Sequence, residues 1–293
     1  MDVLLWWLLL VSARALAPQK TQLGPGSFEP SEWATYPRDA LLFDEMSATV
    51  SSAWEHGMRR ACVRLGVRDL AFLHDDDEND ERCVLAVAVE LAKRWTKGPR
   101  CVLTASPAAK TEADDLVGPG CNVGVATLSS QAAVRGRGGL PALLDDDDDD
   151  RGPALVVVVA PDSFECRTFV ANPVAHIQCV AARLAGSEAF LVLLNPRLAL
   201  PSPVAAGRNM PPLLLRDFEY VYVAEADALD ATVLDDSGIA LYHRWPHPSW
   251  RLFERRNRHF AFVGTAPHRP SDSQLRAVYR AANGVTHVEG MDF

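Results

Sequence analysis

Two short apolar runs, each ending at a proline, stand out in the pattern of hydrophobic and polar positions. They cover residues 154–161 and 190–196, and an amphipathic segment that contains Pro173 lies between them. A continuous apolar run of this length indicates a strand buried on both faces, and the strand–helix–strand order indicates parallel strands. Pro173 should kink the connecting helix or divide it into two. Ligands of such sheets bind just beyond the carboxyl ends of the strands.

Helical and alternating patterns flank this centre. Helices are predicted over residues 43–57, 80–97 and 271–282, and further strands over residues 61–67, 101–104 and 122–127. Alternation in the strand at 61–67 predicts one covered face. The last third alternates at 218–223, 239–245, 250–254 and 259–263, which is typical of antiparallel strands. The chain is therefore predicted to be α/β, a three-layer Rossmann-like sheet with a parallel centre and antiparallel C-terminal strands.

The amino terminus has the pattern of a leader. Nine apolar residues at positions 3–11 precede small residues at positions 13, 15 and 17. A membrane span needs roughly 20 apolar residues, so this run has the length of a signal-peptide core; a buried helix of the mature fold is the alternative. We expect a signal-like leader over 1–17, a transit or linker segment over 18–37 and a single domain over 38–290, with no transmembrane helix in the mature chain.

Charge and cysteine usage change this picture little. The formal net charge is −9, but two runs of six acidic residues, within 75–81 and over 145–150, carry twelve of the negative charges. The rest of the chain is net positive, so overall charge excludes no class of partner. Adjacent aspartates repel one another, which predicts a solvated acidic loop near 135–152. The six cysteines form no C-x-x-C pair, and isolated buried thiols are expected rather than a disulfide framework.

Four polar residues follow the two apolar runs directly and are the candidates for ligand binding: Asp162, Ser163, Asn195 and Arg197. They lie where a parallel sheet gathers its ligands. Each also has a structural alternative. Asp162 and Ser163 have the residue types that cap a helix, and Asn195 can lock a loop through backbone hydrogen bonds.

A basic region near the carboxyl terminus offers a second candidate surface. Eight arginines between residues 244 and 280 face only two acidic side chains. We expect Arg255, Arg256 and Arg258 to be exposed at a hairpin turn and, with Arg251, to form a surface for a partner. Such a surface suits phosphate groups, anionic lipid heads or acidic protein. A solvated face that complements the acidic runs of the same chain is the alternative.

Motifs for other chemistry are absent from the sequence. It contains no P-loop string, no G-x-S-x-G elbow and no cysteine signature with a partnering histidine. Residues 75–79 copy the start of a calcium loop but lack its later glycine and glutamate. His243 and His247 flank Pro246 with no third zinc ligand nearby. We therefore predict no cofactor, no metal and no nucleic acid, and the sequence indicates no catalytic residues.

Several of these segments, taken in order, resemble the DUF1995 family of plants, algae and cyanobacteria. They are residues 159–161, 193–196, 238–246 with Trp250, and 266–271. The resemblance covers about residues 38–283 and implies a chloroplast protein with an α/β domain. Members of that family occur alone or attached to chloroplast adenylate kinases, and some are linked to the accumulation of photosystem II. No established catalytic residues come with the family, and the kinase activity of the fused forms is not carried over.

Two hypotheses for function follow. The first is a plastid-targeted, non-catalytic auxiliary or assembly factor for photosynthetic complexes, with thylakoid or photosystem proteins as partners. The second is a nucleotide- or phosphometabolite-binding α/β enzyme with a pocket at the carboxyl ends of the central strands. The leader predicts the plastid as the location, with the secretory pathway as the alternative.

Overall fold

The computed structural model describes residues 40–66, 80–128, 153–160, 173–196, 217–230, 237–256 and 259–282. Nine strands lie within them: β1 (Arg60–Leu65), β2 (Arg100–Thr104), β3 (Gly124–Thr127), β4 (Leu155–Val159), β5 (Phe190–Leu194), β6 (Glu219–Asp230), β7 (Ser237–Arg244), β8 (Trp250–Arg256) and β9 (His259–Ala266). The helices of the described residues are α2 (Ala40–Glu55), α3 (Asp80–Arg94), α4 (Pro107–Val117), α6 (Pro173–Arg183) and α8 (Asp272–Ala282). The leader, the linker and the acidic loop lie outside these residues and stay predictions.

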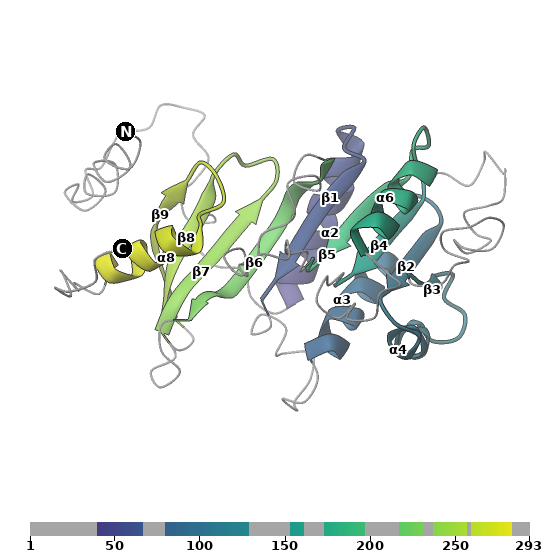
Figure 1. Cartoon of the computed structure of the whole chain (residues 1–293), viewed down its shortest axis with the longest axis horizontal. Coiled ribbons are helices and arrows are strands. Elements are labelled where there is room, and N and C mark those ends of the chain that lie inside the picture. The colour runs from purple at the N-terminus through teal and green to yellow at the C-terminus, as the bar shows by residue number, and fades with distance from the viewer. Residues whose placement is uncertain are drawn as a thin grey trace.

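All nine strands belong to one mixed sheet, in the order β3-β2-β4-β5-β1-β6-β7-β8-β9. The pairings from β3 to β6 are parallel, and those from β6 to β9 are antiparallel. Figure 1 shows the two halves side by side, with β6 at the junction. The predicted fold class, a parallel centre with antiparallel C-terminal strands, is confirmed.

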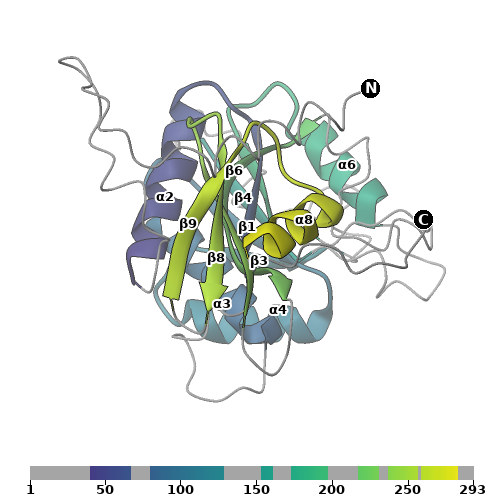
Figure 2. The same cartoon turned by 90° about the vertical axis from the view of Figure 1, so that its left-hand side faces the viewer.

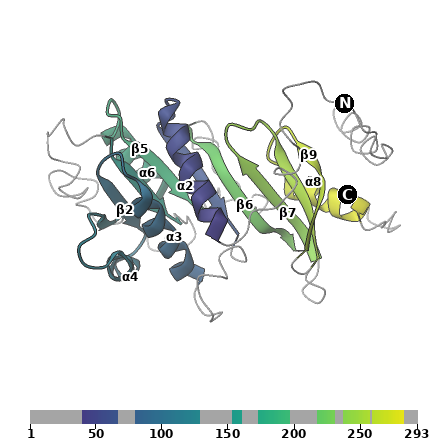
Figure 3. The same ribbon diagram turned by 180° about the vertical axis from the view of Figure 1, so that it is seen from behind.

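Helices cover both faces of the sheet and make three layers (Figure 2). On one face, α2, α3 and α4 bury the largest apolar cluster against the strands, and α2 and α3 lie in front when the molecule is seen from behind (Figure 3). On the other face, α6 packs over the parallel strands and α8 over the antiparallel strands, each with its own apolar cluster. Because both faces are covered, the uniformly apolar β4 and β5 are buried along their whole length.

The prediction of one covered face for the strand at residues 61–67 is wrong. β1 lies between β5 and β6, and every residue from Ala61 to Leu65 is buried. Cys62 is fully buried in the cluster on the α6 face, and Arg64 is only 7% exposed. The alternation in the sequence therefore places a charged side chain in the interior, where it needs an ionic partner.

One helix, α4, was not expected from the apolar pattern, although its ends carry clear signals. Ser106 is the N-cap, and its hydroxyl accepts a hydrogen bond of 3.1 Å from the backbone N–H of Ala109. Pro107 occupies the first turn, and Gly118 ends the helix with a φ of 72°. Pro173, which was expected to kink or divide a helix, is instead the first residue of α6, a position at which a missing backbone N–H costs least.

Five cysteines lie in the described residues, and none of them forms a disulfide there: Cys62, Cys83, Cys101, Cys121 and Cys179. Isolated buried thiols were expected. Cys62 and Cys101 are buried, and their burial raises the pKa of each thiol. Cys121 and Cys179 are exposed instead, so the expectation fails for these two.

Candidate functional site

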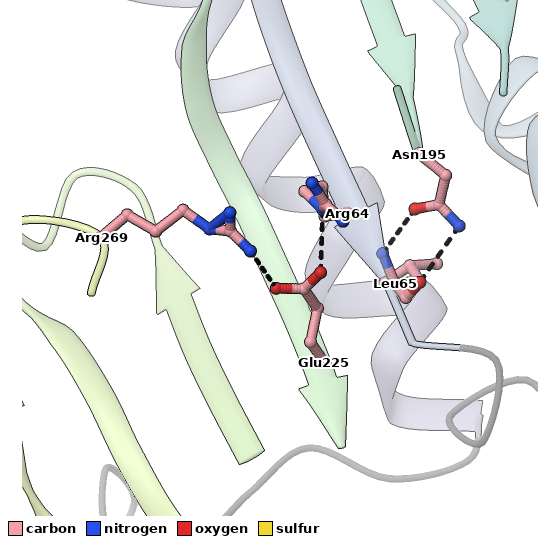
Figure 4. A network of polar contacts seen from close by, with 5 residues as sticks. All are labelled: Arg64, Leu65, Asn195, Glu225 and Arg269. Carbon is pink, nitrogen blue, oxygen red and sulfur yellow. Dashed lines mark hydrogen bonds and ion pairs between the residues drawn. The ribbon is translucent and has the colours of Figure 1, made fainter. Parts of the chain in front are cut away.

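Ligand binding was predicted at the carboxyl edge of the parallel strands, and of the four candidate residues there the structure describes Asn195. This residue follows β5 with a φ of 48°, and its side chain reaches the end of β1 (Figure 4). Its Oδ1 accepts from the backbone N–H of Leu65 at 2.7 Å, and its Nδ2 donates to the Leu65 carbonyl at 3.1 Å. The side chain thus performs the locking role that was the structural alternative. Asp162, Ser163 and Arg197 lie outside the described residues, and their roles stay predictions.

Beside Asn195, a buried ionic network joins β1, β6 and the segment after β9 (Figure 4). Arg64 Nε lies 2.8 Å from one carboxylate oxygen of Glu225, and Arg269 Nη2 lies 2.8 Å from the other. Glu225 is only 3% exposed. Opposite charges at this distance attract strongly away from water, so the carboxylate ties two arginines from distant parts of the chain to one face of the sheet.

The environment keeps Arg64 charged. Burial by itself would lower the pKa of Arg64, but the Glu225 carboxylate and a hydrogen bond with the Tyr220 side chain raise it above its ordinary value. Burial raises the pKa of Tyr220, against the opposing effect of Arg269 and Arg64. The face between α6 and α8 therefore carries fixed positive charge next to a neutral phenol.

A large open cleft lies at the opposite, amino edge of the same strands. Its volume is about 1330 Å³, which exceeds the roughly 300–1,000 Å³ of a typical small-molecule pocket. We call it the amino-edge cleft. Its charged and titratable lining is Arg59, Arg60, Asp217, Glu219, His243, His247, His268 and Arg269, and its aromatic lining is Phe218, Tyr220, Trp245 and Trp250. The end of α6, the segment between α6 and β5, and β5 itself add Ala181, Leu184, Ala185, Ala189 and Leu191.

Two turns form the polar wall of this cleft. One joins β7 to β8 and contributes Trp245 and His247; the other follows β9 and contributes His268 and Arg269. In Figure 1, α6 and α8 lie apart on this face, with β1 and β6 between them. Arg269 belongs both to the cleft lining and to the Glu225 network, so it connects the two edges.

His243 is the most constrained titratable group of the cleft. Its ring stacks on Trp250 with centroids 4.6 Å apart and an interplanar angle of 15°. Nε2 lies 3.1 Å from the Tyr220 carbonyl oxygen, and Nδ1 lies 3.4 Å from that of Ser249. Burial lowers the pKa of His243, only partly opposed by these two backbone contacts. The ring is therefore a neutral wall of the cleft at physiological pH.

The predicted arginine surface is changed by the structure. Arg255 is 1% exposed and Arg251 is 6% exposed, so the exposure expected of Arg255 is wrong. Both lie within β8, where alternate side chains point to one covered face of the sheet. Arg256, the last residue of β8, is exposed and pairs with Glu254 at 2.7 Å. Arg258 lies outside the described residues.

The paired histidines of the sequence also differ in their surroundings. His243 faces two backbone carbonyls, whereas His247 accepts through Nδ1 from the backbone N–H of Ser249 at 3.1 Å. Within the described part of the chain, no group of three histidine, cysteine or acidic side chains is placed to hold a metal ion.

Comparison with known families matches residues 41–277 to the domain of unknown function DUF1995. The chain belongs to the DUF1995 family. The segments on which the resemblance rests now have places in the fold. Residues 159–160 and 193–196 end β4 and β5 at the carboxyl edge, whereas His243, Trp245, Pro246, Trp250 and residues 267–269 line the cleft at the amino edge.

Other comparisons add little about this DUF1995 protein. No curated protein matches the sequence. Among solved structures, it is similar in part to the cytoplasmic domain of the Thermomonospora curvata type VII secretion ATPase EccC, with 14% identity and a TM-score of 0.30. The alignment covers 73% of this chain and 24% of that one, so the chain spans about a quarter of its length. A likeness at this level carries no argument about function.

Sequence reasoning missed the amino-edge cleft of the DUF1995 domain. The signal was present in two turns, Trp245-Pro-His-Pro248 and Pro267-His-Arg269, which both place aromatic or basic residues directly beside strand ends. Assigning them to one site requires knowing that β7 and β9 end at the same edge of the sheet as β6 begins. Helices that could cross a membrane, judged by length and apolar character, do not occur among the described residues.

Proposed function

We propose that this DUF1995 protein is a plastid binding protein that acts as an auxiliary factor for photosynthetic complexes and contacts its partner through the amino-edge cleft. The observation that carries the proposal is the composition of the cleft wall. Segments by which the family is recognised supply His243, Trp245, Trp250, His268 and Arg269 to one open cavity. The location and the class of partner rest on the leader and on the family resemblance.

The chemistry of the cleft suits a protein segment. Aromatic and arginine side chains are the residues most enriched at the centres of protein interfaces. Here Trp245 and Arg269 share the lining of the cavity with two apolar side chains, Ala181 of α6 and Leu184 directly after it. A cavity of about 1330 Å³ that is open to solvent accommodates an extended segment better than it encloses a metabolite.

Crosslinking mass spectrometry on isolated plastids tests the proposal. The variant Ala185→Trp places a bulky ring in the cleft, because Ala185 is an exposed residue of its lining. Its matched control is Ala182→Trp, since Ala182 is exposed on α6 but does not line the cleft. We expect crosslinks to thylakoid proteins from the wild type and from Ala182→Trp, and their loss in Ala185→Trp.

Two outcomes would contradict this proposal. One is the absence of any thylakoid crosslink from the wild-type chain. The other is a set of crosslinks that persists in Ala185→Trp but disappears in Arg256→Glu. That second outcome would assign the contact to the surface around Arg256 at the end of β8 instead of the cleft.

A nucleotide- or phosphometabolite-binding enzyme is the second candidate, and one observation favours it. Ala160 and Asn195, directly after β4 and β5, have positive φ values of 38° and 48°. Backbone strain of this kind clusters at functional sites. Thermal-shift screening with nucleotides and phosphorylated metabolites tests this candidate. A ligand that stabilises the wild type but not Asn195→Ala would favour it, and a flat screen would count against it.

A further inference from the structure

Arg269 presents a firmly held guanidinium at the wall of the amino-edge cleft. Its Nη2 donates to Glu225 at 2.8 Å, and its guanidinium carbon lies 5.7 Å from the centre of the Tyr220 ring. The side chain is 17% exposed, and it contributes to the lining of the cleft. Two contacts in different directions thus fix the group before any ligand arrives, which lowers the entropic cost of binding.

The guanidinium retains donor capacity beyond its contact with Glu225. An arginine side chain has five N–H donors. Among the described residues, Arg269 makes one hydrogen bond with them, to Glu225. Its Nε is buried and lacks a hydrogen-bond partner within the same residues. Glu225 in turn is shared with Arg64, so its negative charge is not reserved for Arg269. A second anion placed against Arg269 is therefore favoured, and partial burial strengthens that attraction.

Apolar surface lies in the same cavity as this cation. Ala181 lines the cleft from α6, Leu184 and Ala189 line it from the segment between α6 and β5, and Phe218 adds an aromatic ring. A free phosphate would leave this surface uncovered. A peptide with alternating acidic and apolar side chains would pair with Arg269 and cover the apolar wall together.

We infer that the amino-edge cleft binds an acidic peptide segment of a partner protein, with a side-chain carboxylate paired to Arg269 and an apolar side chain against α6. Glu225 and Tyr220 are positioning residues that hold the guanidinium. This inference rests on the cleft of the proposed function and adds the chemistry of the segment that enters it.

Isothermal titration of the full chain tests the inference with a capped pentapeptide of alternating leucine and aspartate. The matched peptide replaces each aspartate with asparagine and so keeps the shape while removing the charge. Inorganic phosphate is the third titrant. We expect the acidic peptide to bind at least about tenfold more tightly than the asparagine peptide, and added salt to weaken its binding.

Three variants locate the interaction. Arg269→Gln should weaken binding of the acidic peptide by about tenfold or more, whereas Arg276→Gln should leave it unchanged. Arg276 is the matched control because it is an exposed arginine of α8 outside the cleft lining. Ala185→Glu leaves the Glu225 network unchanged but adds a negative charge to the cleft lining, and its repulsion of the acidic peptide should weaken binding. Ala185→Lys adds a positive charge at the same position and should maintain or strengthen binding of that peptide.

Equal binding of both peptides would overturn the inference, and so would full affinity in Arg269→Gln. Binding of phosphate as tight as that of the acidic peptide, with the same loss in Arg269→Gln, would overturn it in favour of a small-anion site. The proposed function fails separately. Thylakoid crosslinks that disappear in Ala185→Trp would sustain the cleft as the contact site even if the acidic peptide does not bind.

Discussion

The two edges of the parallel strands use polar side chains in opposite ways. At the carboxyl edge, the amide of Asn195 is bonded on both sides to the backbone of Leu65, and Arg64 is paired with Glu225 inside the sheet layer. At the amino edge, Trp245, His268 and Arg269 line a cavity open to solvent. At these residues, hydrogen bonds and an ion pair occupy the polar side chains of the carboxyl edge, where parallel sheets usually bind ligands. The open cavity lies at the opposite edge.

This difference has a topological cause. Crossover helices bring the chain back to the amino edge of a parallel sheet, but β6 is followed here by three antiparallel strands. The β7–β8 turn therefore falls at the amino edge beside the start of β6, together with the segment after β9. The antiparallel extension thus adds two turns to an edge that would otherwise carry only helix–strand connections.

The largest effect is expected from removing the charge at the centre of the buried network. Glu225→Ala leaves Arg64 and Arg269 without their shared carboxylate, and should reduce the free energy of unfolding by about 3–5 kcal/mol. Urea denaturation measures this. The control is Asp114→Ala, which breaks the exposed pair with Lys110 and should cost less than about 0.5 kcal/mol. Similar losses of unfolding free energy in both variants would show that the buried network does not stabilise the fold more than an exposed ion pair does.

A smaller but clear loss is expected at the carboxyl edge. Asn195→Ala leaves the backbone N–H and carbonyl of Leu65 without the amide, and should lower the free energy of unfolding by about 2–3 kcal/mol. Asn195→Gly should be about 1 kcal/mol less damaging, because glycine accepts the φ of 48° without strain. Asn122→Ala, at an exposed position, serves as control. If Asn195→Ala proved neutral, the amide would be available for a ligand after all.

The buried arginine of β8 should matter more than its exposed neighbour. Arg255→Gln removes packed side-chain atoms from a position that is 1% exposed, and should cost about 2 kcal/mol. Arg256→Gln removes an exposed pair with Glu254 and should cost less than about 0.5 kcal/mol. Denaturation midpoints of the two variants give the comparison. A larger loss in Arg256→Gln than in Arg255→Gln would contradict the burial of Arg255 and favour the exposed arginine surface predicted from the sequence.

The smallest effect expected is a pH dependence from His243. Because burial lowers its pKa in the folded state, the unfolded chain, with a histidine pKa near ~6.5, binds the proton more readily. Stability from this group is complete above that value and falls as the pH drops below it, by at most about 1.4 kcal/mol per pH unit. Urea unfolding between about pH 5 and 8 should show this slope in the wild type and a shallower slope in His243→Gln. Identical slopes would mean that the ring is accessible in the folded cleft.

Much of the fold could be predicted because it is encoded locally. The runs that became β4 and β5 are apolar throughout, and the alternation that became β6 to β9 is equally plain. The helix α4 was also within reach, since Ser106, Pro107 and Gly118 mark its ends. Its buried residues, Ala109, Ala113 and Val117, are too small to give a strong periodic signal.

The candidate site could not be predicted in the same way. Arg64 and Arg269, some two hundred positions apart in the sequence, both pair with Glu225. Alternation alone indicated that Arg64 faced solvent. Burial of Arg255 likewise depends on what covers β8, which no local pattern contains. The cleft exists only because separate turns meet at one edge, so its lining follows from strand order.

Hydrogen–deuterium exchange of the full chain, with and without solubilised thylakoid complexes, compares the two edges in one measurement. We expect the complexes to slow amide exchange in the segments that form the cleft, residues 181–191, 243–250 and 267–269. Amides of the carboxyl edge around Leu65 and Asn195 should exchange at unchanged rates. Protection confined to the carboxyl edge or to the end of β8, with the cleft segments unaffected, would rule out the amino-edge cleft as the contact site.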